Sequence, residues 1–369
     1  MRAWRFGGRS MFSAAAIFAM ATTFGCGTSS SPRGSMATPS GSMATRRYAH
    51  VAVTLPKDQV LVAAGYNAAG FIGSAEVYTP KTGAWSPAGT LTTPRNYPNA
   101  VALPGGRALV LGGIGASGYL ASTEIYDSQS NAWIAGAPMS VARYAPSATP
   151  TIAGKILVAG GFDGITYHAS SELYTTASGT WAPTGAMATG RWLHAETALP
   201  QGRVLVVGGQ NATGFLASAE IYDPTTGTWT SAGTMSTPRR GHRAVLLSKG
   251  NKVLVTGGEN GSGSLASAEI YDPASNAWTT VAPMKVPRYL HTATLLKKDQ
   301  VLVTGGRSGV GYAESTEIYD PRTGAWSPGP AMKEKRYFHT ASEIKDGKDV
   351  LLSGGWSGVE VLNSAEILP

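Results

Sequence analysis

The chain has 369 residues, of which only 14% are charged, and it contains 47 glycines and 22 prolines. This much glycine and proline excludes a mainly helical protein, and the 9 tryptophans and 15 tyrosines exclude a disordered one. The net charge of +8 comes without any dense run of lysine and arginine, so we expect no nucleic-acid partner. Many short strands joined by turns fit this composition best.

The first segment in chain order reads as an export leader. Residues 1–10 hold three arginines, and residues 11–24 form an apolar run shorter than the ~20 residues that a membrane-spanning helix needs. A basic start followed by a short apolar run is typical of a signal peptide. Cys26 is the sole cysteine, so no intramolecular disulfide is possible.

Gly25-Cys26 resembles the lipobox of bacterial lipoproteins, although Thr23 and Phe24 depart from its usual leucine and small residue. The resemblance implies a lipoprotein-type signal peptide over residues 1–25 and lipidation of Cys26. Residues 26–35 would then be a flexible tether to the outer membrane or cell surface, and the lipid would be the only membrane contact. The alternative is an ordinary signal peptide and a secreted or periplasmic protein.

The remainder of the chain is one motif written seven times. Its tryptophans recur every 48 or 49 residues, at Trp85, Trp133, Trp181, Trp229, Trp278 and Trp326. A glutamate keeps nearly the same step, at Glu76, Glu124, Glu172, Glu220, Glu269, Glu317 and Glu366. A period close to ~50 residues is typical of a repeat architecture such as a propeller.

Each unit reads as four strands. In the unit that begins at Arg191, we expect strands at 194–199, 204–209 and 218–223 and around Trp229. The residue two positions before each tryptophan is always glycine or asparagine, which predicts a left-handed turn residue there. These positions are Gly83, Asn131, Gly179, Gly227, Asn276 and Gly324.

Gly-Gly after the second strand, Ser-Ala-Glu-Ile-Tyr in the third, Trp in the fourth and Met-x-x-x-Arg beyond it resemble the kelch family. The resemblance covers residues 36–369 and implies an all-β, seven-bladed kelch propeller of the galactose oxidase/kelch superfamily, with four-stranded antiparallel blades. Ala64 departs from the pattern because it replaces the first glycine of unit one.

The blade count depends on the two chain ends. The first three strands of a unit occur seven times, but the tryptophan strand occurs only six times before Pro369. Residues 36–43 align with the tryptophan strand at 84–91, with Ala37 in place of the tryptophan. We therefore expect the N-terminal strand to complete the blade formed by residues 337–369 and to close the ring. The alternative is a seventh blade of three strands.

The kelch resemblance implies a ligand face at one end of the central channel. An arginine from each unit would ring this end, followed by aromatic residues, and the variable loops after Gly-Gly would open on the same face. The expected ligand-binding arginines are Arg47, Arg95, Arg143, Arg191, Arg239, Arg288 and Arg336. The expected ligand-binding aromatics are Tyr48, Tyr144, Trp192, Tyr289 and Tyr337 in the arginine loops, and Tyr66, Phe162 and Trp356 in the Gly-Gly loops.

A structural role is the alternative for the arginines. One arginine and one glutamate per unit is also the pattern of a repeated buried ion pair, since a desolvated charge needs a partner. The histidines three residues beyond the arginines, His50, His194, His242, His291 and His339, are expected to be hydrogen-bonded scaffold residues rather than metal ligands. His168 lies outside this series, and we expect it to be exposed in a loop.

Binding rather than catalysis is the function that the sequence favours. We expect a monomeric recognition module for a protein, peptide or carbohydrate ligand, anionic ligands included, with no cofactor or metal and no catalytic residues. The alternatives are a carbohydrate-active enzyme, such as a sialic acid-like sugar mutarotase, and a structural envelope protein. Copper radical oxidases of this superfamily use a cysteine cross-linked to a tyrosine, and the repeats here contain no cysteine. The acids that break the repeat are Asp163, Glu259 and Glu360, and each alone is a weak catalytic candidate.

Overall fold

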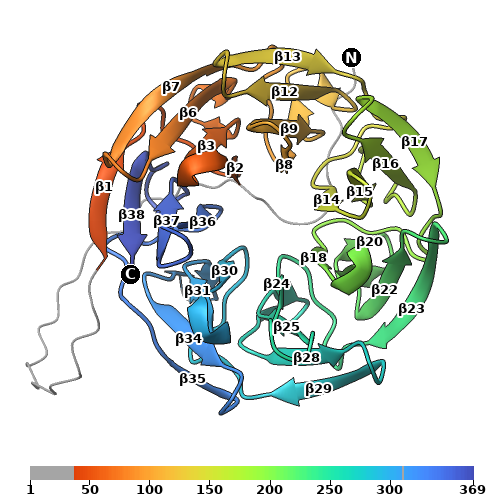
Figure 1. The fold of residues 1–369 in the computed structure, drawn as a ribbon. Coiled ribbons are helices and arrows are strands. Elements are labelled where there is room, and N and C mark those ends of the chain that lie inside the picture. Colours follow the sequence, from red (N-terminus) through yellow and green to blue (C-terminus); the bar gives the residue numbers. More distant parts are fainter. Residues whose placement is uncertain (1–36, 310) are drawn as a thin grey trace, which may run out of the picture. The chain divides into compact units, whose positions relative to one another are not determined.

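Seven four-stranded antiparallel sheets are arranged around a central channel in the computed structural model, which describes residues 37–309 and 311–369 (Figure 1). The seven-bladed propeller predicted from the repeat is confirmed. The leader, Cys26 and the tether lie outside the described residues, and their assignments stay predictions. Among the described residues there is no helix with the length and apolar character to span a membrane.

Each blade places its first strand next to the channel and its last strand at the outer rim (Figure 1). Blade 1 contains β2 (Val51–Thr54), β3 (Val60–Ala63), β6 (Ser74–Thr79) and β7 (Ala84–Thr90). Blade 2 contains β8 (Asn99–Leu103), β9 (Arg107–Leu111), β12 (Thr123–Asp127) and β13 (Ala132–Gly136). Blade 3 contains β14 (Ser147–Pro150), β15 (Lys155–Ala159), β16 (Ser171–Thr175) and β17 (Thr180–Thr184). Blade 4 contains β18 (Ala195–Ala198), β19 (Val204–Val207), β22 (Ser218–Asp223) and β23 (Thr228–Thr234). Blade 5 contains β24 (Arg243–Leu246), β25 (Val253–Thr256), β28 (Ala268–Asp272) and β29 (Ala277–Val281). Blade 6 contains β30 (Thr292–Leu295), β31 (Val301–Thr304), β34 (Thr316–Asp320) and β35 (Ala325–Pro328). Blade 7 contains β36 (Thr340–Ile344), β37 (Asp349–Ser353), β38 (Ser364–Leu368) and β1 (Thr38–Ser42).

Short elements connect these strands at the two ends of the channel. Two-residue hairpins follow Gly-Gly in five blades: β4–β5 (Tyr66–Asn67, Gly70–Phe71), β10–β11 (Ile114–Gly115, Gly118–Tyr119), β20–β21 (Gln210–Asn211, Gly214–Phe215), β26–β27 (Glu259–Asn260, Gly263–Ser264) and β32–β33 (Arg307–Ser308, Gly311–Tyr312). At the other end, single 3-10 turns join the first two strands in three blades: η1 (Pro56–Asp58), η2 (Pro200–Gly202) and η3 (Lys297–Asp299). We call the first end the loop face and the second end the turn face.

The hydrophobic core lies between adjacent blades. The second strand of a blade is buried on both sides, as in β19, where all four residues Val204–Val207 are fully buried. Leu205 and Val207 of this strand pack against Val253 and Val255 of β25 in the next blade. An uninterrupted Val/Leu strand therefore reflects burial on both faces of a sheet.

The turns before the repeated tryptophans have the left-handed backbone conformation that the sequence predicted. The six residues two positions before the tryptophans all have positive φ, between 53° and 70°. The first glycine of the Gly-Gly pair is also constrained by contacts with the next blade, as blade 4 illustrates. Gly208 has a φ of 63°, and a Cβ there would lie 2.6 Å from the Arg239 carbonyl oxygen and 2.6 Å from Cε1 of His242 in the next blade. Ala64 occupies this position in blade 1, where the following blade has Pro98 in place of the histidine.

The N-terminal strand closes the ring, as expected. Strand β1 pairs antiparallel with β38, with Thr38 opposite Ile367 and Ser42 opposite Ser364. Beyond this strand, Met43 donates its backbone N–H to the Asn363 carbonyl oxygen at 2.8 Å. The alternative of a three-stranded seventh blade is therefore wrong.

The repeated tryptophans join each blade to the preceding one. Each indole Nε1–H donates to a backbone carbonyl in or beside the outer strand of the preceding blade, over 2.7–3.2 Å. Trp85 of blade 1 donates to Ser40 in β1, so the closing strand is held from both sides. In blade 7, where Ala37 replaces the tryptophan, the Ala37 backbone N–H donates to the Ala331 carbonyl oxygen at 3.4 Å instead.

Candidate functional site

The loop face brings together the two segments that the sequence predicts to bind a ligand. These are the loop that contains the repeat arginine and the loop that follows Gly-Gly. In every blade, the residue after the repeat arginine pairs with the residue after Gly-Gly; for example, Tyr48 and Tyr66 exchange backbone hydrogen bonds of 3.0 and 3.1 Å. The same bridge joins Tyr144 to Phe162 and Tyr337 to Trp356. These antiparallel bridges place the variable residues of both loops side by side on one surface.

The seven repeat arginines lie beneath this surface and are fully buried. Arg191 is representative: its guanidinium donates to Glu220 at 2.7 Å, to the Gly208 carbonyl at 2.8 Å and to the Ser218 carbonyl at 2.9 Å. Glu220 also accepts the backbone N–H of Ala188 at 2.6 Å, in the segment that arrives from the preceding blade. The ion pairs of the seven blades are Arg47–Glu76, Arg95–Glu124, Arg143–Glu172, Arg191–Glu220, Arg239–Glu269, Arg288–Glu317 and Arg336–Glu366.

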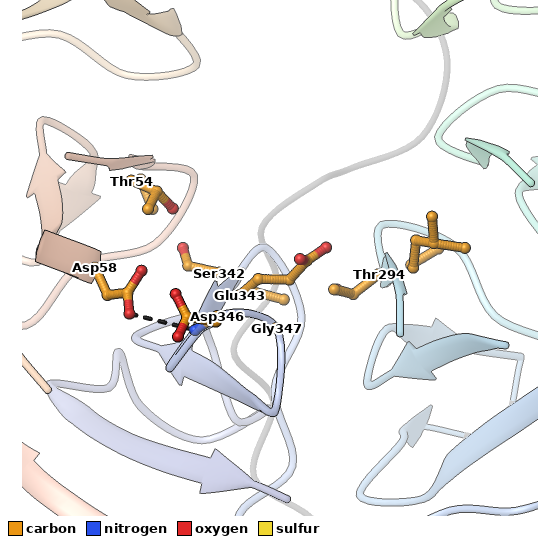
Figure 2. A pocket seen from close by; sticks show the side chains of 11 residues that line it. Thr54, Asp58, Thr294, Ser342, Glu343, Asp346 and Gly347 are labelled. Carbon is orange, nitrogen blue, oxygen red and sulfur yellow. Dashed lines mark hydrogen bonds between the residues drawn. The ribbon is translucent and has the colours of Figure 1, made fainter. Parts of the chain in front are cut away.

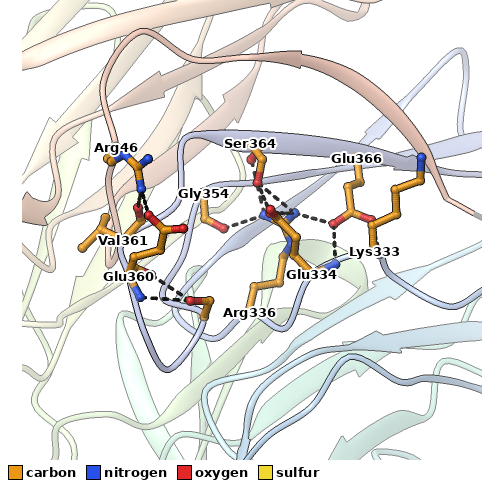
Figure 3. A network of polar contacts seen from close by, with 10 residues as sticks. Arg46, Lys333, Glu334, Arg336, Gly354, Glu360, Val361, Ser364 and Glu366 are labelled. Carbon is orange, nitrogen blue, oxygen red and sulfur yellow. Dashed lines mark hydrogen bonds and ion pairs between the residues drawn. The ribbon is translucent and has the colours of Figure 1, made fainter.

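Each pair therefore joins the loop between two blades to the third strand of its own blade. Burial lowers the pKa of Arg191, and the neighbouring Glu220 carboxylate opposes this effect. Because both Nη atoms of every repeat arginine donate to protein acceptors, these arginines have a structural role in this conformation. Figure 3 shows the blade 7 example, in which Glu334 and Ser364 join Arg336 and Glu366 in one network.

The aromatic residues above the arginines form a continuous surface, which we call the aromatic arc. Its rings contact one another with centroids 4.6–6.2 Å apart. The arc consists of Tyr48, Tyr66, Phe71, Tyr97, Tyr119, Tyr144, Phe162, Tyr167, Trp192, Tyr312, Tyr337, Phe338 and Trp356. All of these side chains are partly exposed. Seven of the eight aromatics nominated from the sequence are members, so the fold does bring them together.

The remaining part of the loop face, over blades 4 to 6, carries polar groups instead. Arg240 pairs with Glu259 at 2.6 Å and also donates to Gln210. Arg307 donates to the Tyr289 hydroxyl at 3.1 Å. Among the described residues, no carboxylate lies within 4.0 Å of the exposed Arg307 side chain. We call this region, which includes the eighth nominated aromatic, Tyr289, the charged arc.

Two aliphatic side chains project from loop tips on the same face. Ile165 is 90% exposed and Val359 is 87% exposed, in the Gly-Gly loops of blades 3 and 7. The loop of Ile165 packs on Tyr119, since a Cβ at Gly164 would lie 2.5 Å from that ring. Likewise, a Cβ at Gly358 would lie 2.3 Å from the Tyr312 ring, so the loop of Val359 packs on Tyr312. Both aliphatic tips are therefore supported by members of the aromatic arc.

The repeat-breaking acids on this face all have local partners. Glu259 pairs with Arg240, and Glu360 pairs with Arg46 (Figure 3). Asp163 accepts two backbone N–H groups within its own loop and lies 3.2 Å from His168 Nε2. His168 is only 7% exposed, so the expectation of an exposed histidine is wrong. Contact with Asp163 and with the loop of blade 3 covers the ring.

A ring of backbone hydrogen bonds narrows the channel at the loop face. The second residue after each repeat arginine has a φ between 49° and 61°. Its N–H donates to the equivalent carbonyl of the preceding blade, over 2.8–3.3 Å, in six of the seven blades. These residues are Ala49, Tyr97, Ala145, Leu193, Gly241, Leu290 and Phe338.

Tyr97 is the central side chain of this ring. Its own ring lies 5.0 Å from Phe338 and 4.9 Å from Tyr144. Burial raises the pKa of Tyr97 well above its usual value, and Tyr144, Tyr337, Tyr48 and Tyr289 reinforce the shift. Since Phe338 belongs to blade 7 and Tyr144 to blade 3, the Tyr97 ring of blade 2 extends toward the channel axis.

The five histidines lie just inside the ring. Nε2 of His339 is 2.8 Å from the Thr304 hydroxyl, and Nε2 of His291 is 3.0 Å from the Thr256 hydroxyl, in each case across a blade boundary. Burial, followed by the nearest arginine, lowers the pKa of His50 and His194 to about 3. The pKa values of His242, His291 and His339 are also well below normal, with burial as the main cause. Among the described residues, no group of three His, Cys, Asp or Glu side chains is placed to hold a metal ion.

Sequence reasoning missed two charged residues inside the channel, Glu196 of β18 and Arg243 of β24. Glu196 Oε1 accepts the Ala148 backbone N–H at 3.1 Å and the Asn99 Nδ2–H at 3.5 Å. Burial raises the pKa of Glu196 to about 7, although these hydrogen bonds and Arg243 oppose the shift. The signal was present in the repeat, since the equivalent residue is alanine in the six other units: Ala52, Ala100, Ala148, Ala244, Ala293 and Ala341.

A cavity of about 570 Å³ opens the channel at the turn face. Strands β2, β30 and β36 line it with Ala52, Ala293 and Ala341, and Figure 2 shows carboxylates of Asp58, Glu343 and Asp346 around it. The Asp346 backbone N–H donates to Asp58 Oδ2 at 3.3 Å. The channel is thus open at the turn face.

Comparison with known proteins assigns the class. The Kelch motif model matches residues 47–92 and 95–140, and the KLHDC2/KLHL20/DRC7 Kelch-repeats domain model matches residues 194–368. The chain is therefore a kelch-repeat propeller. No curated protein sequence matches it.

Among solved structures, a fungal alcohol oxidase of the AA5 family, in complex with copper, has a similar fold. The TM-score is 0.72 at 22% sequence identity, over 88% of this chain and 74% of the oxidase chain. At this identity the likeness shows the fold alone. In all, 1077 chains of solved structures match significantly, so the fold by itself does not select a function.

Proposed function

We propose that this protein is a recognition module that binds a protein or peptide ligand on the loop face of the propeller. The observation that carries the proposal is the aromatic arc, a continuous, partly exposed surface that breaks the sevenfold symmetry of the scaffold. Large aromatic side chains dominate the energetics of protein interfaces because they bury much apolar area with few rotamers to freeze.

The aliphatic tips favour a protein or peptide over a carbohydrate. Ile165 and Val359 are almost fully exposed at either side of the arc. Exposed aliphatic groups next to an aromatic surface are typical of an interaction site, where a partner would cover them. A sugar ring would use the aromatic faces but would gain little from these branched side chains.

The charged arc suggests an acidic group on the ligand. Arg307 is exposed and donates to a tyrosine hydroxyl rather than to a carboxylate. Its planar guanidinium can bind a carboxylate with two parallel hydrogen bonds. The proposed ligand therefore combines an apolar segment with an acidic side chain or a terminal carboxylate. The proposed lipid anchor at Cys26 would hold this face at the cell surface.

Screening the full chain against peptide and glycan arrays tests this function. We expect peptide ligands, and we expect Trp356→Ala or Phe162→Ala to weaken their binding about 10- to 100-fold, the effect of a truncated aromatic hot spot. Ile152→Ala is the matched control, because Ile152 is an exposed aliphatic residue, 43% exposed, at the turn face. Equal losses in the control would contradict the proposed surface, glycan-only hits would favour carbohydrate recognition, and no hits would favour a structural envelope protein.

A sugar mutarotase remains the second candidate because of Glu196. A carboxyl with a pKa of about 7 can both donate and accept a proton at neutral pH, as acid–base catalysis of ring opening requires. We expect anomer exchange of reducing sugars, followed by NMR, to be accelerated by the wild-type protein and lost in Glu196→Gln. Equal rates with and without protein would eliminate this candidate.

A further inference from the structure

The innermost strands carry two charged residues that break their repeat and that the loop face does not explain. The position four residues after the repeat arginine holds an uncharged residue in six blades and Arg243 in blade 5. The uncharged residues are Val51, Asn99, Ser147, Ala195, Thr292 and Thr340. The adjacent position holds alanine in six blades and Glu196 in blade 4. The two substitutions come from neighbouring strands, β18 and β24, which are in contact.

Arg243 differs from the repeat arginines in its hydrogen bonding. Its guanidinium donates once, from Nη1 to the His242 carbonyl oxygen at 3.2 Å. Among residues 37–309 and 311–369, no carboxylate oxygen lies within 4.0 Å of its nitrogens. Arg239, four residues earlier, bonds two carbonyls, a serine hydroxyl and a glutamate. A guanidinium has five N–H donors, so most of those of Arg243 have no acceptor among the described residues.

The groups around Arg243 supply little negative charge below about pH 7. Burial raises the pKa of Glu196 to about 7, so its carboxyl is largely protonated below that pH. The pKa values of His242, His291 and His339 are well below normal, and that of Tyr97 is well above normal, so all four side chains are uncharged. The positive charge of Arg243 is therefore uncompensated below about pH 7, and the Glu196 carboxylate compensates it above that pH.

We propose that the Arg243 guanidinium binds a small carboxylate inside the channel, beside the Glu196 carboxyl and the Asn99 amide. The carboxylate supplies the two acceptors in one plane that the guanidinium fork lacks. A protonated Glu196 is compatible with the bound anion, whereas an ionised Glu196 repels it. This site is separate from the loop face, so it does not depend on the proposed function.

Access is from the turn face. The cavity of about 570 Å³ reaches Ala52, Ala293 and Ala341, which occupy the same repeat position as Glu196. The cavity lining comes from blades 1, 6 and 7, and a molecule of a few non-hydrogen atoms that enters there would follow the channel inward to Glu196 and Arg243.

Titrating the full chain with sodium acetate tests the site. The readouts are the thermal unfolding midpoint and isothermal titration calorimetry, with acetamide as the neutral molecule of similar shape and sodium chloride as the ionic-strength control. We expect acetate alone to bind and to raise the midpoint, because a ligand that binds only the native state stabilises it. Between pH 6 and pH 8 the apparent affinity should fall about tenfold, as the protonated fraction of Glu196 decreases.

The residues at the equivalent positions of the other blades define the substitutions. Arg243→Thr introduces the residue of blades 6 and 7, and it should abolish the acetate response; Arg243→Lys keeps the charge without the fork and should weaken it. Glu196→Ala introduces the residue of the six other blades, and it should bind acetate equally at pH 6 and pH 8. An acetate response that survives in Arg243→Thr, or that chloride reproduces in the wild type, overturns the proposal. Trp356→Ala should leave acetate binding unchanged, which separates this site from the loop face.

Discussion

Lowering the pH from 7.5 to 5 is expected to unfold the propeller cooperatively. The five imidazoles of the repeat series have depressed pKa values in the folded protein, two of them at about 3, and burial also lowers the pKa of His168. The unfolded chain takes up protons at these histidines below about pH 6.5, while the folded chain does not. Their stabilising contribution is therefore complete above pH 6.5 and decreases as the pH falls.

The size of this effect is comparable to the total stability of a typical domain. Each buried neutral imidazole removes about 1.4 kcal/mol of unfolding free energy per pH unit below its unfolded pKa. Five of them remove about 7 kcal/mol per unit, against a total of about 5–15 kcal/mol for a typical domain. Glu196 acts in the opposite direction, because its raised pKa adds about 1.4 kcal/mol per unit as the pH falls from about 7 to 4.5. Unfolding should therefore begin between about pH 6 and pH 5.

Tryptophan fluorescence and urea unfolding at a series of pH values measure this dependence. The slope of unfolding free energy against pH gives the number of protons taken up, and it should be about four between pH 6 and pH 5. His194→Gln should reduce that number by about one, and Glu196→Ala should increase it by about one. A fold that stays intact to pH 4 would show that the histidines titrate normally.

Removing one member of a repeat ion pair is expected to destabilise the protein by about 3–5 kcal/mol. Arg191→Met leaves the buried Glu220 carboxylate without its cation, and the fully buried position prevents water from replacing the guanidinium. The double variant Arg191→Met/Glu220→Gln should recover part of the loss, because no unpaired charge remains.

The matched control lies one blade further along the chain, on the same face. Arg240 also pairs with a glutamate, but the Arg240 and Glu259 side chains are 22% and 18% exposed. Arg240→Ala should change stability by about 1 kcal/mol or less. Denaturant unfolding of the three variants compares the two environments. If Arg191→Met folds with wild-type stability but loses a peptide ligand, the repeat arginines recognise ligands after all.

The blade repeat, the closing strand and the grouping of the aromatic residues could all be predicted from the sequence alone. A repeat of 48 or 49 residues with short apolar strands and fixed turn glycines leaves little freedom, because each local preference agrees with the same blade. The closing strand was also predictable, since residues 36–43 align with the tryptophan strand and blade 7 lacks one. Seven of the eight nominated aromatics lie together because their repeat positions fix them at the loop face.

Tertiary structure alone decided what the charged residues do. The spacing of arginine and glutamate is the same whether they bind each other or a ligand, and only burial and hydrogen bonding distinguish the two. Glu196 and Arg243 are residue types that usually lie on a protein surface. Their sequence neighbours do not show that β18 and β24 place them near each other in the channel. Local physics specifies a blade, but the environment of a channel residue is created by seven blades together.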